Sequence, residues 1–307
     1  MGRLLITGAS GMVGRNLIDT NPGYEILTPS HAELDLLDQG RVIRYLHIHN
    51  PTAIIHAAGM VGGIRANMKN NVGFFLVNMQ MGLNLVSAAH KSGVKNILNL
   101  GSSCIYPVWV ANPLPESMLF TGSPEPTNEG YAYAKMMALK LCQYYNKQEG
   151  TNYKTIIPCN LYGRYDKFDP QNSHMIAGAI AKLHNGNGKI WGDGTAKREF
   201  MYAGDLADII WQIIDRFGYI PEVLNIGTGK DYTINQYYRA IAGVVGFDGE
   251  FVHDMKKPVG SGRKLLDVTM QRKLKLMPTT TLKQGLELTY EYYINSINVG
   301  RGRNTGY

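Results

Sequence analysis

The chain has 307 residues, enough to bury a large core, and this length predicts one large domain or two lobes rather than several small domains. Hydrophobic residues make up 44% and charged residues 18% of it, without acidic or Pro/Ser/Gln-rich blocks, which excludes a mainly disordered chain. The net charge of +7 favours anionic partners, but Lys and Arg are scattered, so it fits a nucleotide-sized ligand and we expect no nucleic-acid partner.

Apolar strand patterns and helix patterns alternate along the first half of the chain. Strands are predicted at residues 3–7, 24–28, 53–58, 96–103 and 155–163, and helices at 12–19, 40–49, 74–93 and 129–145. Strands that alternate with helices of this length predict a parallel sheet covered on both faces, which is a doubly wound α/β fold. We therefore expect a Rossmann domain over residues 1–162.

The pattern loosens between residues 162 and 201, where Gly, Asn, Pro and aromatic residues suggest loops that cross a ligand crevice. A helix at 204–217 and a strand at 222–227 return to the sheet, so residues 205–228 are assigned to the first domain. Helices at 233–246 and 281–295 predict a smaller C-terminal lobe within 163–307, mainly for substrate binding. The last residues, 298–307, are expected to form a flexible basic tail.

The three cysteines, Cys104, Cys142 and Cys159, are an odd number at spacings that match no metal site or disulfide framework. This usage suits a reducing compartment, and we expect no bound metal. The longest apolar stretch, residues 53–64, is too short and too polar to cross a bilayer. No charged start followed by an apolar segment opens the chain, so we expect a cytoplasmic protein without a membrane partner.

A glycine turn, Gly8, Gly11 and Gly14, stands between the first strand and the first helix. Glycine allows positive φ and close approach of the backbone to a pyrophosphate at the helix N-terminus, although the same residues could simply close a tight turn. No carboxylate is expected at the tip of the second strand, where Ser30 and His31 leave room for a 2′-phosphate. We therefore expect NADP (NADPH) as the cofactor, with Arg15 within reach of that phosphate.

Tyr131 and Lys135 lie four residues apart on one face of the helix at 129–145. A tyrosinate at neutral pH costs roughly 4 kcal/mol. An ammonium about 4 Å away stabilises the tyrosinate by a similar free energy at an effective dielectric constant near 20. Lys135 could thus make Tyr131 a usable proton donor, although the alternative of a packed tyrosine and a solvated lysine fits the spacing alone.

Residues 99–107, "NLGSSCIYP", follow the fourth strand. In an extended segment Ser102 and Cys104 share one side and Ser103 faces the other. Ser102 would then hydrogen-bond a substrate carbonyl oxygen while Tyr131 protonates it. Cys104 could instead be a small core residue.

Several segments in order resemble the GDP-L-fucose synthase family of extended short-chain dehydrogenases: "GASGMVG", "VGGIRAN", "LGSSCIYP", "EPTNEGYAYAK", "CNLYGRYDKFDPQNSHMI", "GDGTAKREF" and "GRKLLDV". The resemblance runs from about residue 3 to about 294. It implies that Ser102, Tyr131 and Lys135 form a reductive triad, and that Cys104 and His174 exchange protons at the carbons beside the ketone.

The expected cofactor contacts span the glycine turn, two strand ends and the catalytic helix: Gly8, Ser10, Gly11, Met12, Val13, Gly14, Asp35, Leu36, Ala57, Ala58, Tyr131, Lys135, Leu161 and His174. The resemblance implies substrate contacts from Asn160, Lys182, Trp191, Arg198 and Lys264, and Ser103 faces away or touches the sugar. Lys182 stands where the family often has arginine and Met60 replaces a lysine, which leaves the sugar open.

These features lead us to expect NADPH-dependent C4 reduction of a GDP-linked 4-keto-6-deoxy sugar with 3,5-epimerisation, in GDP-L-fucose-like nucleotide-sugar and polysaccharide biosynthesis. The alternatives are a C4-reductase only, acting on a related sugar such as a heptose, and a nucleotide-sensing protein without catalysis. The retained Tyr131 and Lys135 argue against the latter. Relatives in this family are usually dimers, so we expect a homodimer through helices near residues 71–90 and 131–145.

Overall fold

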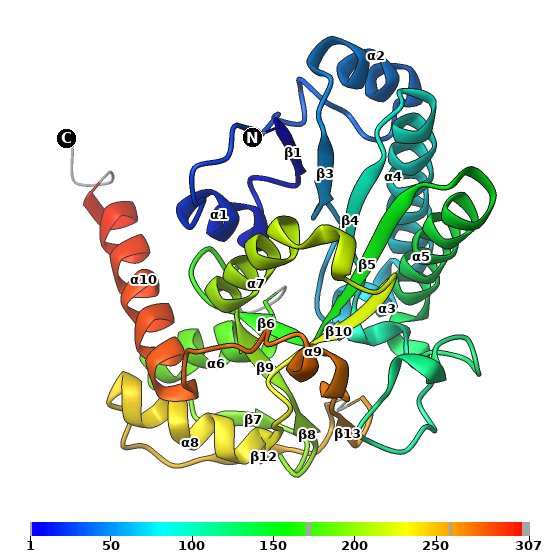
Figure 1. Ribbon diagram of the computed structural model, residues 1–307. Helices are drawn as coiled ribbons and strands as arrows, with labels where there is room; N and C mark the ends of the chain where they lie inside the picture. Colours follow the sequence, from blue (N-terminus) through cyan, green and yellow to red (C-terminus); the bar gives the residue numbers. More distant parts are fainter. Residues whose placement is uncertain (1, 170–172, 258–259, 303–307) are drawn as a thin grey trace.

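A sheet of six parallel strands forms the centre of the computed structural model, which describes residues 2–169, 173–257 and 260–302 (Figure 1). The strands are β1 (Leu4–Thr7), β2 (Ile26–Leu27), β3 (Ala53–His56), β4 (Asn96–Leu100), β5 (Asn152–Pro158) and β10 (Val223–Ile226). Their order across the sheet is β10-β5-β4-β3-β1-β2. The chain leaves β1 to one side for β2 and returns to the other side for β3, so the direction of winding reverses beside β1. The predicted doubly wound fold is confirmed.

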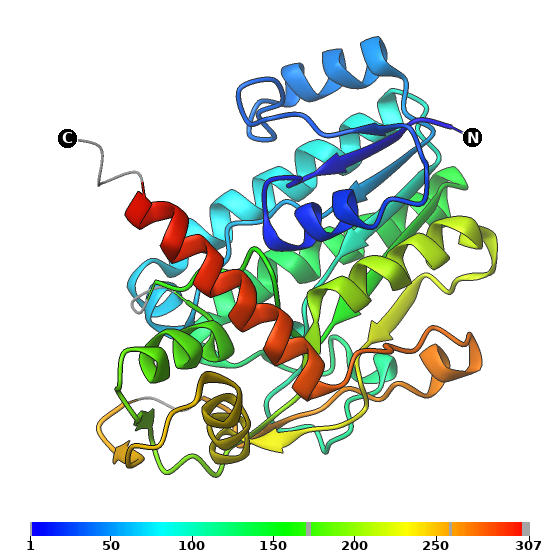
Figure 2. The same ribbon diagram turned by 90° about the vertical axis from the view of Figure 1, so that its left-hand side faces the viewer.

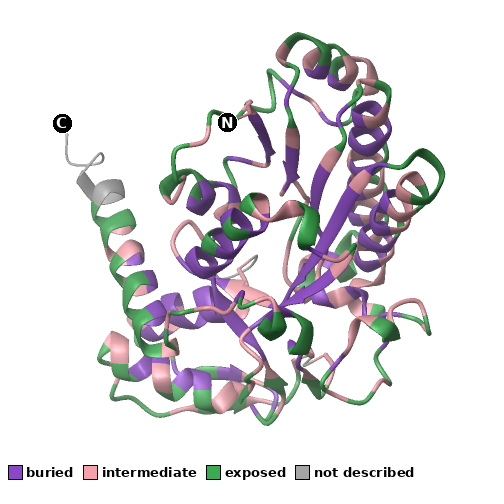
Figure 3. Cartoon of the chain, in the orientation of Figure 1, coloured by how far each residue is buried: buried purple, intermediate pink, exposed green. Residues whose placement is uncertain are grey.

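Helices cover both faces of this sheet. α2 (Gln39–His49), α4 (Asn71–Lys91) and α5 (Glu129–Glu149) lie on one face, and α1 (Met12–Asp19) and α7 (Ala203–Asp215) on the other (Figure 1). The strands between them are largely buried (Figure 3). Successive side chains of a strand point to opposite faces, so Leu5 packs in a core with Val42 and Leu85, while Leu4 and Ile6 pack with Leu206.

The second half of the chain adds a lobe below the carboxyl ends of the strands in Figure 1. Its helices are α6 (Met175–His184), α8 (Ile234–Val245) and α10 (Leu282–Gly302), and Figure 2 shows α10 along the outside of the molecule. Ile180, Ile241 and Leu286 share one apolar core. The short elements are α3 (Ile64–Lys69), β6 (Asn160–Tyr162), β7 (Lys189–Trp191), β8 (Lys197–Arg198), β9 (Phe200–Tyr202), β11 (Tyr232–Thr233), β12 (Val252–Asp254), β13 (Arg263–Lys264) and α9 (Thr269–Lys273).

The structure corrects several predicted elements. The expected loops between residues 162 and 201 contain α6 and three strands, because α6 is buried on nearly all sides and therefore has no amphipathic stripe. The strand expected at 155–163 divides into β5 and β6, and β6 pairs with β9 instead of the central sheet. The expected tail is wrong for residues 298–302, which continue α10, and residues 303–307 lie outside the described residues.

Within the described residues, α4 is the helix long and apolar enough to span a membrane by length and composition. Half of its apolar window is buried inside the molecule, where α4 packs against α2 and α5.

Asn225 in β10 connects the edge of the sheet to two distant segments. Its side chain is fully buried, accepts a hydrogen bond from Tyr106 Oη at 2.7 Å and donates to the carbonyls of Leu114 at 2.9 Å and Asp267 at 3.1 Å. Leu114 lines the cleft described below, and Asp267 follows Lys264, another lining residue, by three positions. Asn225 therefore fixes these two segments to the sheet.

We expect Asn225→Leu to lower the free energy of unfolding by about 2–4 kcal/mol, because the hydroxyl of Tyr106 and the carbonyls of Leu114 and Asp267 each lose a hydrogen bond. Tyr106→Phe, which removes only the hydroxyl, should cost about 1 kcal/mol. Urea unfolding of the two variants and the parent measures both values. Equal losses from the two variants would show that the amide contacts of Asn225 add nothing.

Candidate active site

A cleft of about 500 Å³ runs from the β1–α1 turn to the C-terminal lobe. It opens at the carboxyl ends of the parallel strands beside the reversal of winding, where ligands bind in open α/β sheets. Its lining includes eighteen of the residues expected from the sequence: Gly8, Gly11, Met12, Val13, Gly14, Ala57, Ser102, Ser103, Cys104, Tyr131, Lys135, Asn160, Leu161, His174, Lys182, Trp191, Arg198 and Lys264.

Four expected cofactor residues, Ser10, Asp35, Leu36 and Ala58, do not belong to this lining. Ser10 is exposed on the turn. Leu36 is buried in the core beneath α2 and α4, and Asp35 accepts a hydrogen bond from the backbone N–H of Leu37. Ala58 serves the turn through its backbone, which lies against Gly8.

The glycine turn is built on close backbone approaches. Gly8 has φ of +73°, and a Cβ on it would lie 2.6 Å from the backbone nitrogen of Ala58. A Cβ on Gly14 would lie 2.3 Å from the carbonyl oxygen of Gly8. Gly11 caps α1 without a side-chain hydrogen bond, so the first N–H groups of the helix remain available to an anion. This geometry fits the diphosphate of a dinucleotide.

A carboxylate lies in the loop after β2, where none was expected from the sequence. Glu33 curls back to this loop, where its carboxylate accepts hydrogen bonds from the backbone N–H of Ser30 at 2.8 Å and from Ser30 Oγ at 2.7 Å. These hydrogen bonds lower the pKa of Glu33. The guanidinium of Arg15, expected to reach a 2′-phosphate, lies 4.7 Å from the ring centre of Tyr165.

Ser102 and Cys104 lie together for a reason other than the predicted one. Residues 103–105 form a single 3₁₀ turn instead of an extended strand, and Ser102 Oγ accepts a hydrogen bond from the backbone N–H of Cys104 at 3.3 Å. The turn leaves Cys104 partly buried at the cleft and Ser103 only 3% exposed.

The sulfur of Cys104 is surrounded by hydrogen-bond donors. Lys264 Nζ lies 3.5 Å and Asn128 Nδ2 3.2 Å from Sγ. Burial acts to raise the pKa of the thiol, but the Lys264 charge and hydrogen bonds from Ser102, Lys264 and Asn128 outweigh it, so the pKa lies below its ordinary value. Cys142 and Cys159 are buried free thiols whose pKa burial raises.

Tyr131 and Lys135 project from the first two turns of α5 into the same cleft. Lys135 Nζ donates to the carbonyl of Leu100 at 2.9 Å and lies 5.9 Å from the ring centre of Tyr131. Burial lowers the pKa of Lys135 to about 8. Burial and the nearby Cys104 raise the pKa of Tyr131, against a smaller lowering by Ser102. The charge of Lys135 does not outweigh burial at Tyr131 in this structure, and its expected effect on proton donation by Tyr131 stays a prediction.

His174 precedes α6 and faces Asp166, with 3.6 Å between Nδ1 and Oδ1. The Asp166 side chain is only 4% exposed, and its Oδ2 has no hydrogen-bond partner among the described atoms. A carboxylate beside Nδ1 favours a proton on that nitrogen, and His174 itself lines the cleft.

The far end of the cleft is basic and aromatic. Lys182 Nζ lies 5.1 Å from the ring centre of Trp191 and 3.4 Å from Tyr238 Oη. Burial, with the nearby Lys189, lowers the pKa of Lys182. Arg198 and Lys264 are register neighbours in parallel strands and so project toward the same side. This end suits an anionic, planar group.

Sequence reasoning missed three residues of this site: Asn128, Asn67 and Asp166. Asn128 and Asn67 line the cleft, and each has a buried side-chain oxygen without a described partner. All three fall within quoted segments of the chain, but an isolated Asn or Asp carries no periodic signal. No group of three His, Cys, Asp or Glu residues able to hold a metal occurs in the described residues.

Comparison with known proteins identifies close relatives along the whole chain. The profile of the NAD dependent epimerase/dehydratase family matches residues 4–227. A GDP-L-colitose synthase of Yersinia pseudotuberculosis is 49% identical over 96% of this chain and 99% of its own. A GDP-L-fucose synthase of Azorhizobium caulinodans is 44% identical over 97% and 98%. A GDP-mannoheptose C4 reductase from Campylobacter jejuni, solved with NADP bound, has a TM-score of 0.86 and 27% identity over 95% and 98%.

We expect Gly14→Ala to weaken NADPH binding about tenfold or more, a loss of about 1.4 kcal/mol or more, because the added methyl displaces α1 from the turn. Fluorescence titration with NADPH measures this affinity. Gly243→Ala is the matched control, since a Cβ there meets nothing within 4 Å. Unchanged NADPH affinity in a folded Gly14→Ala protein would contradict the proposed cofactor position.

Proposed function

Because the chain belongs to the NAD-dependent epimerase/dehydratase family, as its resemblance to the GDP-L-fucose synthases led us to expect, we propose that it reduces a GDP-linked 4-keto-6-deoxy sugar at C4 with NADPH and also epimerises C3 and C5. One observation carries the proposal. Cys104, with its lowered pKa, lines the same cleft as Ser102, Tyr131 and Lys135.

The reductive half of the reaction uses the groups at the end of β4 and the start of α5. NADPH supplies the hydride for C4 when it is bound against the glycine turn. Ser102 Oγ donates to the carbonyl oxygen, and Tyr131, whose pKa is raised by burial, delivers the proton that oxygen needs. Lys135 is held by the Leu100 carbonyl close to the same ring.

Epimerisation uses the acidity of the carbons beside the ketone. With the carbonyl oxygen held by Ser102 and Tyr131, Cys104 and His174 remove and return a proton at C3 and at C5. Both residues line the cleft, Cys104 from the turn after β4 and His174 from the start of α6. Their proposed roles follow from this placement together with the family resemblance.

The proposed function divides the chain into a cofactor-binding part and a substrate-binding part. We assign cofactor binding to residues 1–162 with 205–228, because the glycine turn and the six-stranded sheet lie there. Residues 163–307 mainly bind the substrate, with Trp191, Lys182 and Arg198 at the nucleotide and diphosphate end.

A second candidate is C4 reduction without epimerisation, on a related GDP-linked sugar such as a heptose. The structural similarity to the GDP-mannoheptose C4 reductase favours it. The two sequence relatives bear the names of synthases of GDP-L-colitose and GDP-L-fucose, and they are more similar in sequence to this chain, which favours the first candidate.

We also propose a homodimer. Val72, Leu76 and Leu83 on α4, with Met137 and Tyr144 on α5, leave large apolar side chains exposed on two adjacent helices. An exposed apolar patch of this kind typically marks a protein–protein interface. We place the enzyme in the cytoplasm, where it would supply a sugar nucleotide for polysaccharide biosynthesis; fractionation of cells expressing the chain tests this location.

Incubation with GDP-4-keto-6-deoxymannose in D2O without NADPH should place deuterium at C3 and C5, which mass spectrometry and NMR detect. Cys104→Ser should lose this incorporation but still reduce C4 when NADPH is added, because Ser102, Tyr131 and Lys135 remain. Tyr131→Phe is the complementary variant and should lower C4 reduction by about 10²–10⁴-fold. Absence of deuterium in the parent, together with active C4 reduction, would favour the second candidate.

We expect Leu76→Glu combined with Tyr144→Glu to convert a dimer into a monomer, since charges are strongly disfavoured in a desolvated apolar interface. Light scattering after size exclusion gives the mass. Tyr219→Glu, at an exposed position outside α4 and α5, is the control and should stay dimeric. A monomeric parent at micromolar concentration rules out the proposal.

A further inference from the structure

The sulfur of Cys104 accepts hydrogen bonds from side chains in three separate parts of the chain. Ser102 belongs to the same turn, Asn128 directly precedes α5, and Lys264 belongs to β13 in the C-terminal lobe. Asn128 Nδ2 at 3.2 Å and Lys264 Nζ at 3.5 Å approach Sγ itself. An N–H donor and an ammonium so placed stabilise a thiolate more than a neutral thiol.

Asn128 stands at the N-cap of α5 but does not make the usual capping hydrogen bond. An asparagine at the N-cap of a helix normally accepts a hydrogen bond from the first turn, but Asn128 makes no such capping bond. Its amide nitrogen instead donates to Cys104 Sγ, and its buried oxygen has no partner among the described atoms. The Asn128 side chain therefore hydrogen-bonds a residue of the cleft and does not cap α5.

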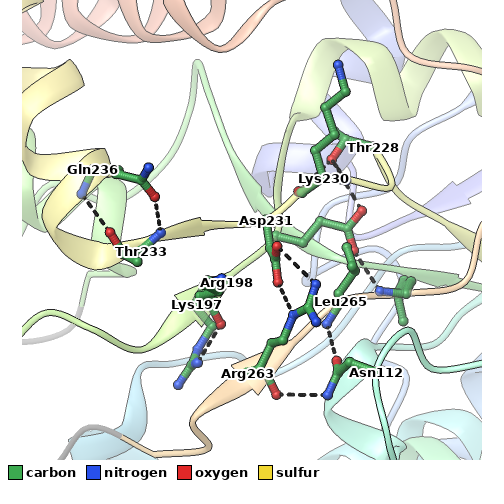
Figure 4. A network of polar contacts seen from close by, with 12 residues as sticks. Asn112, Lys197, Arg198, Thr228, Lys230, Asp231, Thr233, Gln236, Arg263 and Leu265 are labelled. Carbon is green, nitrogen blue, oxygen red and sulfur yellow. Dashed lines mark hydrogen bonds and ion pairs between the residues drawn. The ribbon is translucent and has the colours of Figure 1, made fainter.

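Lys264 is held in place through its backbone. Asn112 Oδ1 accepts from the N–H of Leu265 at 2.7 Å, and the N–H of Leu114 donates to the carbonyl of Leu265 at 2.8 Å. The neighbouring Arg263 is anchored to Asp231, as Figure 4 shows. Within the described chain, no carboxylate lies within ion-pair distance of Lys264. Its charge is therefore directed at the sulfur.

We propose that Lys264 and Asn128 are positioning residues that hold Cys104 as a thiolate, the form in which it can act as a base in the proposed epimerisation. This inference rests on the proposed function and assigns Lys264 a role other than the diphosphate contact that the family resemblance implies.

Inversion at the carbon beside the ketone needs a base on one face and an acid on the other. The Cys104 thiolate takes the proton from the carbon beside the ketone, forming an S–H bond. The electron pair of the broken C–H bond moves into the enolate, whose oxygen is held by Ser102 and Tyr131. His174, which also lines the cleft, donates a proton to the opposite face of that carbon; the C–H bond forms as the enolate returns to the ketone, and exchange with solvent then resets both side chains. Lys264 keeps its proton throughout.

The rate of Cys104 alkylation by iodoacetamide measures the thiolate without any substrate. At pH 7, Lys264→Met should slow this alkylation about tenfold or more, because the thiol pKa returns toward or above its ordinary value. Lys264→Arg should keep most of the rate, and Asn128→Ala should show an intermediate loss. The pH profile of alkylation should shift to higher pH only in the slowed variants. Arg198, which also interacts with Glu125, and the titratable Tyr131 interact electrostatically with Cys104 as well.

Two variants serve as controls. Cys104→Ser gives the background from the buried Cys142 and Cys159. Lys182→Met removes another cleft lysine, one that contacts Tyr238 and Trp191 instead of the sulfur, and should leave the alkylation rate unchanged. An alkylation rate of folded Lys264→Met within about twofold of the parent overturns the proposal.

Calorimetric titration with GDP separates the two roles of Lys264. A positioning role predicts that Lys264→Met binds GDP within about threefold of the parent, whereas a diphosphate contact predicts a loss of about tenfold or more, equal to about 1.4 kcal/mol. If Lys264→Met loses about tenfold in GDP affinity while its Cys104 alkylation rate stays that of the parent, the positioning role of Lys264 is overturned. Because neither assay uses turnover, their outcome is distinct from failure of the proposed function, which the deuterium experiment reports.

Discussion

The close contact between the backbone at Gly8 and the backbone at Ala57 and Ala58 sets the geometry on which the rest of the site depends. It brings the ends of β1 and β3 together where the winding of the sheet reverses, and α1 starts directly above this point. A side chain at Gly8 would separate these strand ends. The glycine turn, the end of β4 and the start of α5 consequently face one cleft.

Charge in this cleft is controlled by burial as well as by partners. Lys135 loses part of its affinity for a proton because it is buried, while the tyrosine beside it gains affinity for the same reason. Cys104 moves against the effect of burial, because it has a cation and two hydrogen-bond donors at its sulfur. Neighbouring groups in one cleft are thereby prepared for different proton transfers, one as donor and one as acceptor.

The local features of this site were predictable from sequence, whereas the long-range ones were not. A strand, three spaced glycines and a helix predict a nucleotide turn, and Tyr131 and Lys135 share a helix face, because these relations depend on short separations. Contacts between Lys264 and Cys104, or Asn225 and Tyr106, join residues more than one hundred positions apart and leave no periodic signal. The prediction of an extended segment after Ser102 was also wrong, because residues 103–105 form a 3₁₀ turn and a strand pattern does not show where the extended backbone ends.

The origin of Lys264 in the second lobe has a consequence for the protein during its synthesis. A ribosome that has completed β1 to β5 and α5 has already made Cys104, Tyr131 and Lys135, but Lys264 follows more than one hundred residues after β5. Until that segment docks against Asn112 and Leu114, Cys104 lacks its cation and behaves as an ordinary thiol. The lowered thiol pKa of Cys104 is therefore a property of the finished fold and is absent from the growing chain.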